Sequence, residues 1–512
     1  MNISDDYIEE YYNINPTIND FFLKEKWNNK KHIQPNIYSE EYNKLIYKLN
    51  KKFILLLKQK KNLSFDDKLL LHNLKYTNYI NDNYIFLKYL PIDLMNNLLI
   101  EYVTEANGEG IYLFKKKDDY NYFLKRIKSL NNITETIIKK LKQGIKHNIT
   151  IYRKTIDKII ENLKKILSLK LYYKKKVLIN RKIWDEGINK YLVTNLNTFL
   201  HFLLNEYYIH TTYNFGLHNF KKGKDCYIKM IKNNTFKDIS PEKIHKIGFK
   251  ELKKLQKLNI KGESSKYKNE KDILKDLNKY KNRSIKIHDK LFHGKLTNND
   301  IYQIKKIPLE KNHLFAYYIS GDIKNIRKGT FFINTSNPNI INKDELYILS
   351  LHEGIPGHHY QINNLLKNNN FTDYRKVSLY NSYSEGWALY CEHMGIYKNK
   401  YYTIQYNIHR CVRLIIDTGI HYYGWSYDKC FNFMKKNIPS INNERIHNEL
   451  LRYINIPSQA LTYKIGEKTF IYLKNKYIQN GGNIKDFHKI IMDIGPCPLD
   501  FLVDYFLENN LI

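Results

Sequence analysis

Apolar residues recur at three- and four-residue steps through roughly the first 210 residues. Two stretches show the spacing clearly: Leu45, Ile46, Leu49, Phe53 and Leu56, and then Ile137, Ile138, Leu141 and Ile145. Such spacing gathers apolar side chains on one face of an α-helix, so it predicts a series of amphipathic helices. Prolines are few here, and no long alternating pattern indicates a strand.

The clearest strand pattern comes later, at residues 329–336, which read GTFFINTS before an Asn-Pro turn. We therefore expect a mainly α fold with a small β-sheet. A soft boundary falls at 213–224, where glycines and basic loops begin. We expect residues 1–212 to form a helical N-terminal half and residues 213–512 a second half, although the two could be one continuous fold.

A mostly apolar run in the second half ends in a cluster of histidines. Residues 346–361 read LYILSLHEGIPGHHYQ. A His-Glu pair with further histidines close by is typical of zinc-dependent hydrolases. The metal binds neutral imidazoles, and the neighbouring carboxylate accepts a proton from metal-bound water. His352 is the first expected ligand and Glu353 the expected general base.

The spacing to the second ligand does not fit a straight helix. His352 and His358 are six residues apart, which places them roughly 240° around a helix and about 9 Å along it. Proline removes a helical hydrogen bond and clashes with the preceding turn, so Pro356-Gly357 is expected to break the helix and let His358 fold back. His359 is the alternative second ligand.

A third ligand is expected from residues 384–392, SEGWALYCE, which read as a buried helix. A carboxylate in such a helix is costly unless a metal or a partner neutralises it. Glu385 is the expected ligand. Glu392 lies two turns further along nearly the same face, too far for the same ion, and is expected to orient a ligating histidine.

Five motifs in order resemble one known family. They are HEGIPGHHYQ (352–361), EGWALYCE (385–392), RLIIDTGIHYYGW (413–425), RYINIPSQALTYKIG (452–466) and FHKIIMDIGPCPLDFL (487–502). Together they resemble the zinc-peptidase-like proteins catalogued as DUF885, which are similar in style to the gluzincin metallopeptidases. The resemblance implies a large helical metallopeptidase fold with a small sheet beside the zinc-site helix and a central substrate cleft. It also implies one Zn²⁺ on His352, His358 and Glu385, with Glu353 as base.

Arg413, Asp417 and His421 follow at four-residue steps on an otherwise apolar helix. Such a stripe must be paired or face a cleft. Asp417 could fix the tautomer of His421, which could then donate a hydrogen bond to a developing oxyanion. The alternative is a buried structural network.

Three further residues are candidates for contact with substrate. Tyr463, favoured by the family pattern, could donate to the oxyanion. Arg452 could bind the terminal carboxylate of a peptide, which would make the enzyme an exopeptidase. The strand at 329–336, which contains Asn334, could pair with the substrate backbone. An ordinary small sheet explains that strand equally well.

The net charge of +33 would suggest nucleic acid or another polyanion as a partner. The lysines, however, are spread along the chain among Asn, Ile and Tyr, and no zinc-finger, RNA-recognition or phosphate-loop motif accompanies them. We therefore expect no specific nucleic-acid partner, only nonspecific, salt-sensitive polyanion binding.

Five scattered cysteines indicate a reducing compartment, and no apolar run is long enough for a membrane span. With no secretory pattern at the N-terminus, a cytoplasmic location is expected. The sequence thus predicts a zinc-dependent peptidase, an exopeptidase or oligopeptidase acting on peptides. A non-catalytic zinc-site scaffold and a basic polyanion-binding protein are the alternatives.

Overall fold

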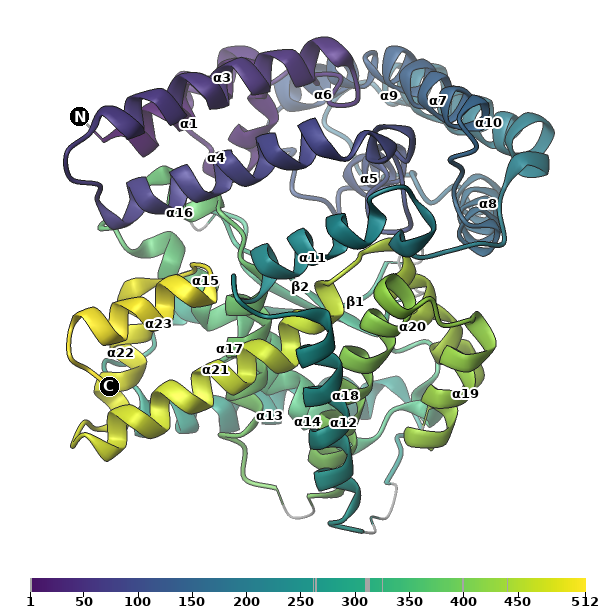
Figure 1. The fold of residues 1–512 in the computed structure, drawn as a ribbon. Coiled ribbons are helices and arrows are strands. Elements are labelled where there is room, and N and C mark those ends of the chain that lie inside the picture. The colour runs from purple at the N-terminus through teal and green to yellow at the C-terminus, as the bar shows by residue number, and fades with distance from the viewer. Residues whose placement is uncertain are drawn as a thin grey trace.

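The computed structural model describes residues 2–260, 262, 265–308, 314–324, 326–397, 400–439 and 441–512. Helices dominate it, as the hydrophobic spacing predicts. The helices of the N-terminal part are α1 (Ile3–Ile14), α2 (Asn19–Phe22), α3 (Glu40–Gln59), α4 (Phe65–Asn83), α5 (Leu98–Asn107), α6 (Lys117–Ile127), α7 (Leu130–Lys146), α8 (Arg153–Ser168), α9 (Arg181–Gly187) and α10 (Thr194–Phe202). They occupy the upper part of the molecule in Figure 1.

Side-chain caps explain where several of these helices begin. The Ser39 hydroxyl accepts a hydrogen bond from the Tyr42 backbone N–H at the start of α3. At the start of α4, Ser64 and Asp67 satisfy each other's backbone N–H groups in a capping box. Each cap satisfies donors that the first helical turn leaves without intrahelical partners.

The hydrophobic cores do not follow the boundary expected at residue 212. Residues 92–207, from α5 to α10, form a core of their own. Helices α1, α3 and α4 instead share a core with the C-terminal part of the chain, where Phe53 and Leu70 belong to the same cluster as Trp387 and Phe470. The first 80 or so residues thus pack with the second half, and the chain returns to them after forming a separate helical core.

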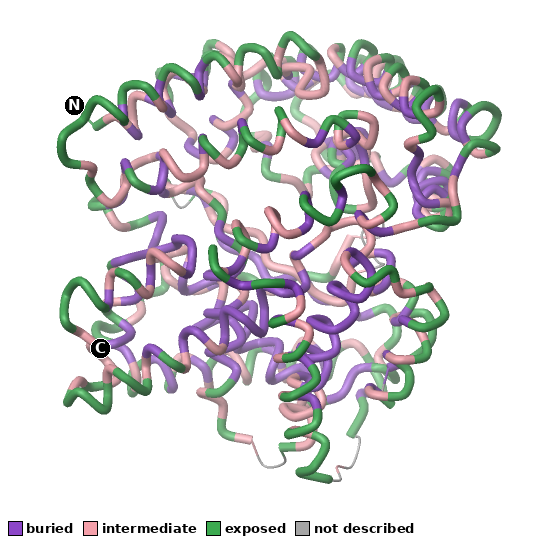
Figure 2. Tube along the Cα trace, in the orientation of Figure 1, coloured by how far each residue is buried: buried purple, intermediate pink, exposed green. Residues whose placement is uncertain are grey.

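The remaining helices lie mostly in the lower part of Figure 1, although α16 lies beside α4. They are α11 (Gly223–Asn234), α12 (Pro241–Gln256), α13 (Glu270–Leu291), α14 (Lys343–Glu353), α15 (His358–Lys367), α16 (Asp373–Val377), α17 (Asn381–Glu392), α18 (Tyr401–Thr418), α19 (Tyr427–Asn437), α20 (Asn443–Asn455), α21 (Gln459–Gln479), α22 (Ile484–Ile494) and α23 (Leu499–Glu508). Helices α14, α17 and α18 are buried over most of their length (Figure 2). No described helix is both long and apolar enough to cross a membrane.

A three-stranded sheet lies among these helices, in the order β1 (Gln303–Lys306), β3 (Thr330–Ile333), β2 (Ala316–Ile319). β3 pairs in parallel with β1 and antiparallel with β2. All four residues of β3 are buried, which fits a central strand. The expected strand is therefore present. Of its two interpretations, the ordinary small sheet fits, because pairing with a substrate requires a free strand edge. Both edges of β3 are occupied, so a substrate backbone could pair only with β1 or β2.

Candidate metal centre

The helix break expected at Pro356-Gly357 is confirmed. α14 ends at Glu353, and α15 begins at His358. A Cβ atom on Gly357 would lie 1.9 Å from the carbonyl oxygen of His352, so the tight return of the chain requires glycine. The Trp387 indole N–H donates to the Pro356 carbonyl at 2.9 Å, which anchors the turn to α17. The turn thereby brings His358 back towards His352.

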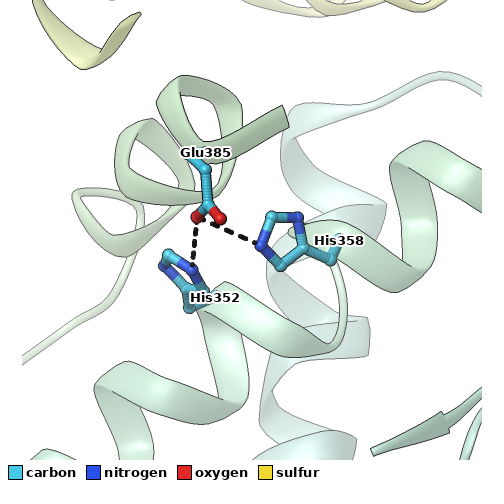
Figure 3. Close-up of side chains that lie close together, drawn as sticks. All are labelled: His352, His358 and Glu385. Carbon is cyan, nitrogen blue, oxygen red and sulfur yellow. Dashed lines mark ion pairs between the residues drawn. The ribbon is translucent and has the colours of Figure 1, made fainter. Parts of the chain in front are cut away.

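Three side chains converge at this turn (Figure 3). The Nε2 atoms of His352 and His358 each lie 3.5 Å from the same carboxylate oxygen of Glu385. The three potential ligand atoms all lie within 4.8 Å of one another. Ligand atoms that share a tetrahedral zinc ion at about 2.1 Å lie about 3.4 Å apart. The two 3.5 Å separations match that spacing, and two imidazoles with one carboxylate are a donor set that suits zinc.

The position of Glu385 depends on a close contact between α17 and α21. A Cβ atom on Gly386 would lie 2.5 Å from Gly466, and one on Gly466 would lie 2.1 Å from the Ser382 carbonyl oxygen. Neither glycine can carry a side chain unless the helix backbones move apart. This pair was not predicted, although a glycine inside each helical motif was the available signal.

Glu392 lies behind His352. Its carboxylate is 2.8 Å from His352 Nδ1, the ring nitrogen that faces away from Glu385. A carboxylate in that place holds the imidazole so that its other nitrogen points to the shared centre. Burial alone would lower the pKa of His352, but its hydrogen bonds with Glu385 and Glu392 raise it to about 10. The carboxylates thus favour a cationic partner at this centre.

Glu353 follows His352 directly and is 9% exposed. Burial raises the pKa of its carboxyl group, while the nearby histidines oppose that shift. The Glu353 side chain makes no hydrogen bond with the part of the chain that the structure describes. It can therefore still exchange a proton with a bound molecule.

His359, the alternative second ligand, does not join the cluster. Its Nδ1 lies 2.8 Å from the Tyr318 hydroxyl, and its Nε2 lies 2.7 Å from the Asp300 carbonyl oxygen. Both ring nitrogens are therefore engaged elsewhere. Of the two adjacent histidines, His358 is the one that reaches Glu385.

His421 and Asp417 require a correction. His421 is fully buried, its Nδ1 accepts from the Leu217 backbone N–H, and its Nε2 donates to the Tyr453 carbonyl oxygen. Asp417 accepts from the Tyr227 hydroxyl and the Ser458 N–H, not from His421. These contacts form a buried structural network, and His421 has no N–H left for an oxyanion.

The helix geometry explains why Asp417 and His421 do not contact each other, as their four-residue spacing predicts they should. α18 ends at Thr418, and Gly419–Tyr423 continue as a π-helix. The wider turn rotates His421 away from the face that carries Asp417. Burial lowers the pKa of His421 to about 4 and raises that of Asp417 to about 7.

Tyr463 and Arg452 lie together, and Asn334 lies apart from them. The Tyr463 hydroxyl accepts from Arg452 Nη1 at 3.5 Å and from Gln459 Nε2 at 3.4 Å, so its own hydrogen is available for donation. Asn334 donates to the Leu314 carbonyl and accepts from the Ser336 N–H. Its side chain thus holds the loop after β3, and a substrate-binding role has no support here.

Arg410 and Glu449 were missed by sequence reasoning. Arg410 Nη2 lies 3.8 Å from the Glu392 carboxylate, and Glu449 accepts from Arg413 Nη2 at 3.1 Å. The available signal was Arg410 itself, one turn before Arg413 on an apolar helix. Arg413, expected to be paired or to face a cleft, is paired on one side of its guanidinium group.

Two solved structures share this fold along nearly the whole chain. One is a candidate lipoprotein from Colwellia psychrerythraea, with a TM-score of 0.79 and 18% identity, covering 99% of each chain. The other is a candidate lipoprotein of unknown function from Shewanella oneidensis, with a TM-score of 0.63 and 14% identity, again covering 99% of each chain.

At these identities the likeness concerns the fold alone. No curated protein matches this sequence. The family described as "Bacterial protein of unknown function (DUF885)" matches residues 60–505. Because that match spans most of the sequence, the chain belongs to the DUF885 family.

Proposed function

We propose that this protein is a gluzincin-like zinc peptidase that hydrolyses peptide bonds in a cleft beside His352, His358 and Glu385. The observation that carries the proposal is the meeting of these three ligand atoms within 4.8 Å, next to the buried carboxylate of Glu353. Two imidazoles and one carboxylate leave one position of a tetrahedral ion for water or substrate, which is the composition of a catalytic rather than a structural zinc site.

The residues would act in the following way. A bound zinc ion would polarise the substrate carbonyl and lower the pKa of water to about 7. Glu353 accepts a proton from the attacking water, whose oxygen bonds to the carbonyl carbon. The C–N bond then breaks, and Glu353 passes the proton to the leaving amine. The Tyr463 hydroxyl donates a hydrogen bond to the carbonyl oxygen as negative charge develops there.

The test replaces Glu353 with Gln and follows two quantities, metal content and hydrolysis of a peptide library by mass spectrometry. The variant should keep one zinc ion per chain but lose roughly a hundredfold or more in rate, the scale of a missing general base. Glu105→Gln is the matched control, because Glu105 is a half-buried glutamate on α5, beside the other core. Normal hydrolysis by the Glu353 variant would rule out the assigned role.

Two other functions would give different results. A non-catalytic zinc-site scaffold would bind one zinc ion and hydrolyse nothing. A polyanion-binding protein, which the net charge of +33 favours, would bind DNA or heparin in a salt-sensitive way, and that binding would survive His352→Ala.

A cytoplasmic location also remains a proposal. Its support is that all five cysteines are buried and unpaired, as expected in a reducing compartment. Labelling of the thiols in freshly isolated protein would test it, since an oxidising compartment would leave fewer of them free after denaturation.

A further inference from the structure

Three arginines surround one tyrosine ring beside the metal centre. Arg410 and Arg413 come from α18 and Arg452 from α20, and we call them the arginine cluster. Their guanidinium carbons lie 5.5, 4.4 and 5.7 Å from the centre of the Tyr463 ring. Arg410 and Arg413 are each only 6% exposed. Three like charges this close, largely removed from water, repel one another unless anions compensate them.

The carboxylates nearby compensate the cluster only in part. Glu449 accepts a hydrogen bond from Arg413 and lies 3.8 Å from Arg452 Nη2. Glu392 lies 3.8 Å from Arg410, but it already receives the His352 hydrogen bond at 2.8 Å. One carboxylate therefore belongs to the cluster and a second is shared with the metal centre, leaving an excess of positive charge.

Several guanidinium nitrogens in the cluster have no hydrogen-bond partner among the described residues. They are Nε of Arg410, Nη1 of Arg413, and Nε and Nη2 of Arg452. Buried donors are rarely left unpaired, because the lost hydration is not replaced. Such a concentration of unpaired donors, all cationic, indicates that the cluster receives an anionic group from a ligand.

The cluster is connected to the metal centre. Arg410 contacts Glu392, and Glu392 contacts the metal-facing His352. Arg452 donates to Tyr463, the residue assigned to the substrate carbonyl. The Arg452 side chain is 21% exposed, the largest exposure of the three arginines, so it is the member of the cluster nearest to solvent.

We propose that the arginine cluster binds the C-terminal carboxylate of a peptide substrate, which would make the protein a carboxypeptidase; this inference rests on the proposed peptidase function. A carboxylate is planar and accepts two parallel N–H donors, which matches the guanidinium fork. Each extended residue spans roughly 3.5 Å. A carboxylate at Arg452, beside a scissile carbonyl at Tyr463, is therefore one or two residues from the cleaved bond.

The binding test uses the zinc-loaded Glu353→Gln protein, which should hold peptides without cleaving them. Acetyl-trialanine with a free carboxylate is compared with its C-terminal amide by calorimetry, in roughly 0.3 M salt to screen exposed charges. The acid should bind at least tenfold more tightly, the scale of a charge-assisted hydrogen-bond pair. Equal affinity for acid and amide would overturn the inference.

Substitutions show which residue causes the preference for the peptide acid over its amide. Arg452→Gln should reduce the acid-to-amide ratio to about one, and Arg452→Lys should restore part of it because the charge remains without the fork. Lys436→Gln, an exposed residue on α19 with the same change in charge, should leave the ratio unaltered. A ratio that stays high in Arg452→Gln would place the carboxylate elsewhere. Circular dichroism and melting temperatures show whether each variant is folded.

The activity arm separates this inference from the proposed function. Wild-type enzyme on a peptide library should release single residues or dipeptides from C-terminal acids and spare the amides. Internal cleavage of acids and amides alike would support the proposed peptidase function and refute the carboxylate site. Preferential binding of the acid without any hydrolysis would support the carboxylate site and refute the proposed peptidase function.

Discussion

The two halves of the interior are built from different residues. The core of residues 92–207 is made mostly of Ile, Leu, Val and aromatic side chains, with Asp119 and Arg126 as its buried charged residues. Its helices show one buried and one exposed face (Figure 2). The interior around α14, α17, α18, α20 and α21 instead contains charged and ionisable groups. These include Glu345, His352, Glu353, Glu392, His409, Arg410, Arg413, Asp417, His421, Lys464 and Glu467.

The two interiors differ in how much their side chains contribute to the free energy of unfolding. An aliphatic core gains free energy from buried apolar area, with about 1.5–3 kcal/mol for each fully buried large side chain. A buried ionic interior gains little or nothing in stability relative to apolar residues of the same shape. Under the proposed function, these charges would hold a metal ion and a charged substrate.

The largest change in the free energy of unfolding is expected from a substitution in the aliphatic core. Phe123, on α6, is fully buried and packs against Phe114 and Trp184. Phe123→Ala should lower the free energy of unfolding by about 3–5 kcal/mol, through lost burial and a cavity. Urea denaturation measures this change. Zinc content and peptidase rate per folded molecule should stay at wild-type values.

The control in the same region is Ile209→Ala, because Ile209 is 72% exposed. Its unfolding free energy should stay within about 0.5 kcal/mol of wild type. If Phe123→Ala reduced zinc content without a loss of stability, the division between the two interiors would be mistaken.

A buried carboxyl group in the polar interior should make the free energy of unfolding depend on pH. The pKa of Asp417 is raised by burial to about 7, above its value in the unfolded chain, and hydrogen bonds from Tyr227 and Ser458 oppose the shift only partly. Between about pH 4 and 7 the folded state binds the extra proton. Stability should therefore fall as pH rises through this window, by at most about 1.4 kcal/mol per pH unit, and level off above it.

Asp417→Asn removes that titration. Unfolding free energies of wild type and variant, measured from pH 4.5 to 8, should differ by an amount that grows in the variant's favour up to about pH 7. Parallel profiles for the two proteins would show that Asp417 is ionised throughout.

The smallest of the three effects concerns metal affinity. Glu392→Gln removes the negative charge from His352 Nδ1, so zinc affinity should fall roughly 10- to 100-fold, or about 1.4–2.7 kcal/mol. Competition with a chelator at fixed pH gives the affinity. His359→Asn is the comparison, because His359 bonds to Tyr318 and Asp300 instead; it should retain wild-type affinity. Equal losses in both variants would contradict the assignment of His358.

Local chemistry explains which predictions the structure confirms. The helices follow from apolar spacing, and the break before His358 follows from what Pro356 and Gly357 do to any helix. The strand near residue 330 follows from its β-branched and aromatic residues. Each of these features depends on residues that are neighbours in the sequence, so the sequence contains enough information to predict it.

The errors concern contacts between distant segments. Asp417 and His421 share a face only in a regular α-helix, and the π-helical turn at Gly419 depends on packing that spacing does not reveal. The central place of β3 depends on which strands lie beside it. The core shared by α1, α3 and α4 with the C-terminal helices joins residues more than 300 positions apart.

The sequence by itself determined the helical class, the turn at Pro356-Gly357 and the residue types available for zinc, because these depend on local backbone sterics and side-chain chemistry. Only the tertiary structure decided that His358 rather than His359 meets Glu385, that His421 is taken up by backbone groups, and that three arginines gather around Tyr463. Those outcomes depend on how helices α14, α17, α18, α20 and α21 cross, and helix crossings are set by packing across the whole interior.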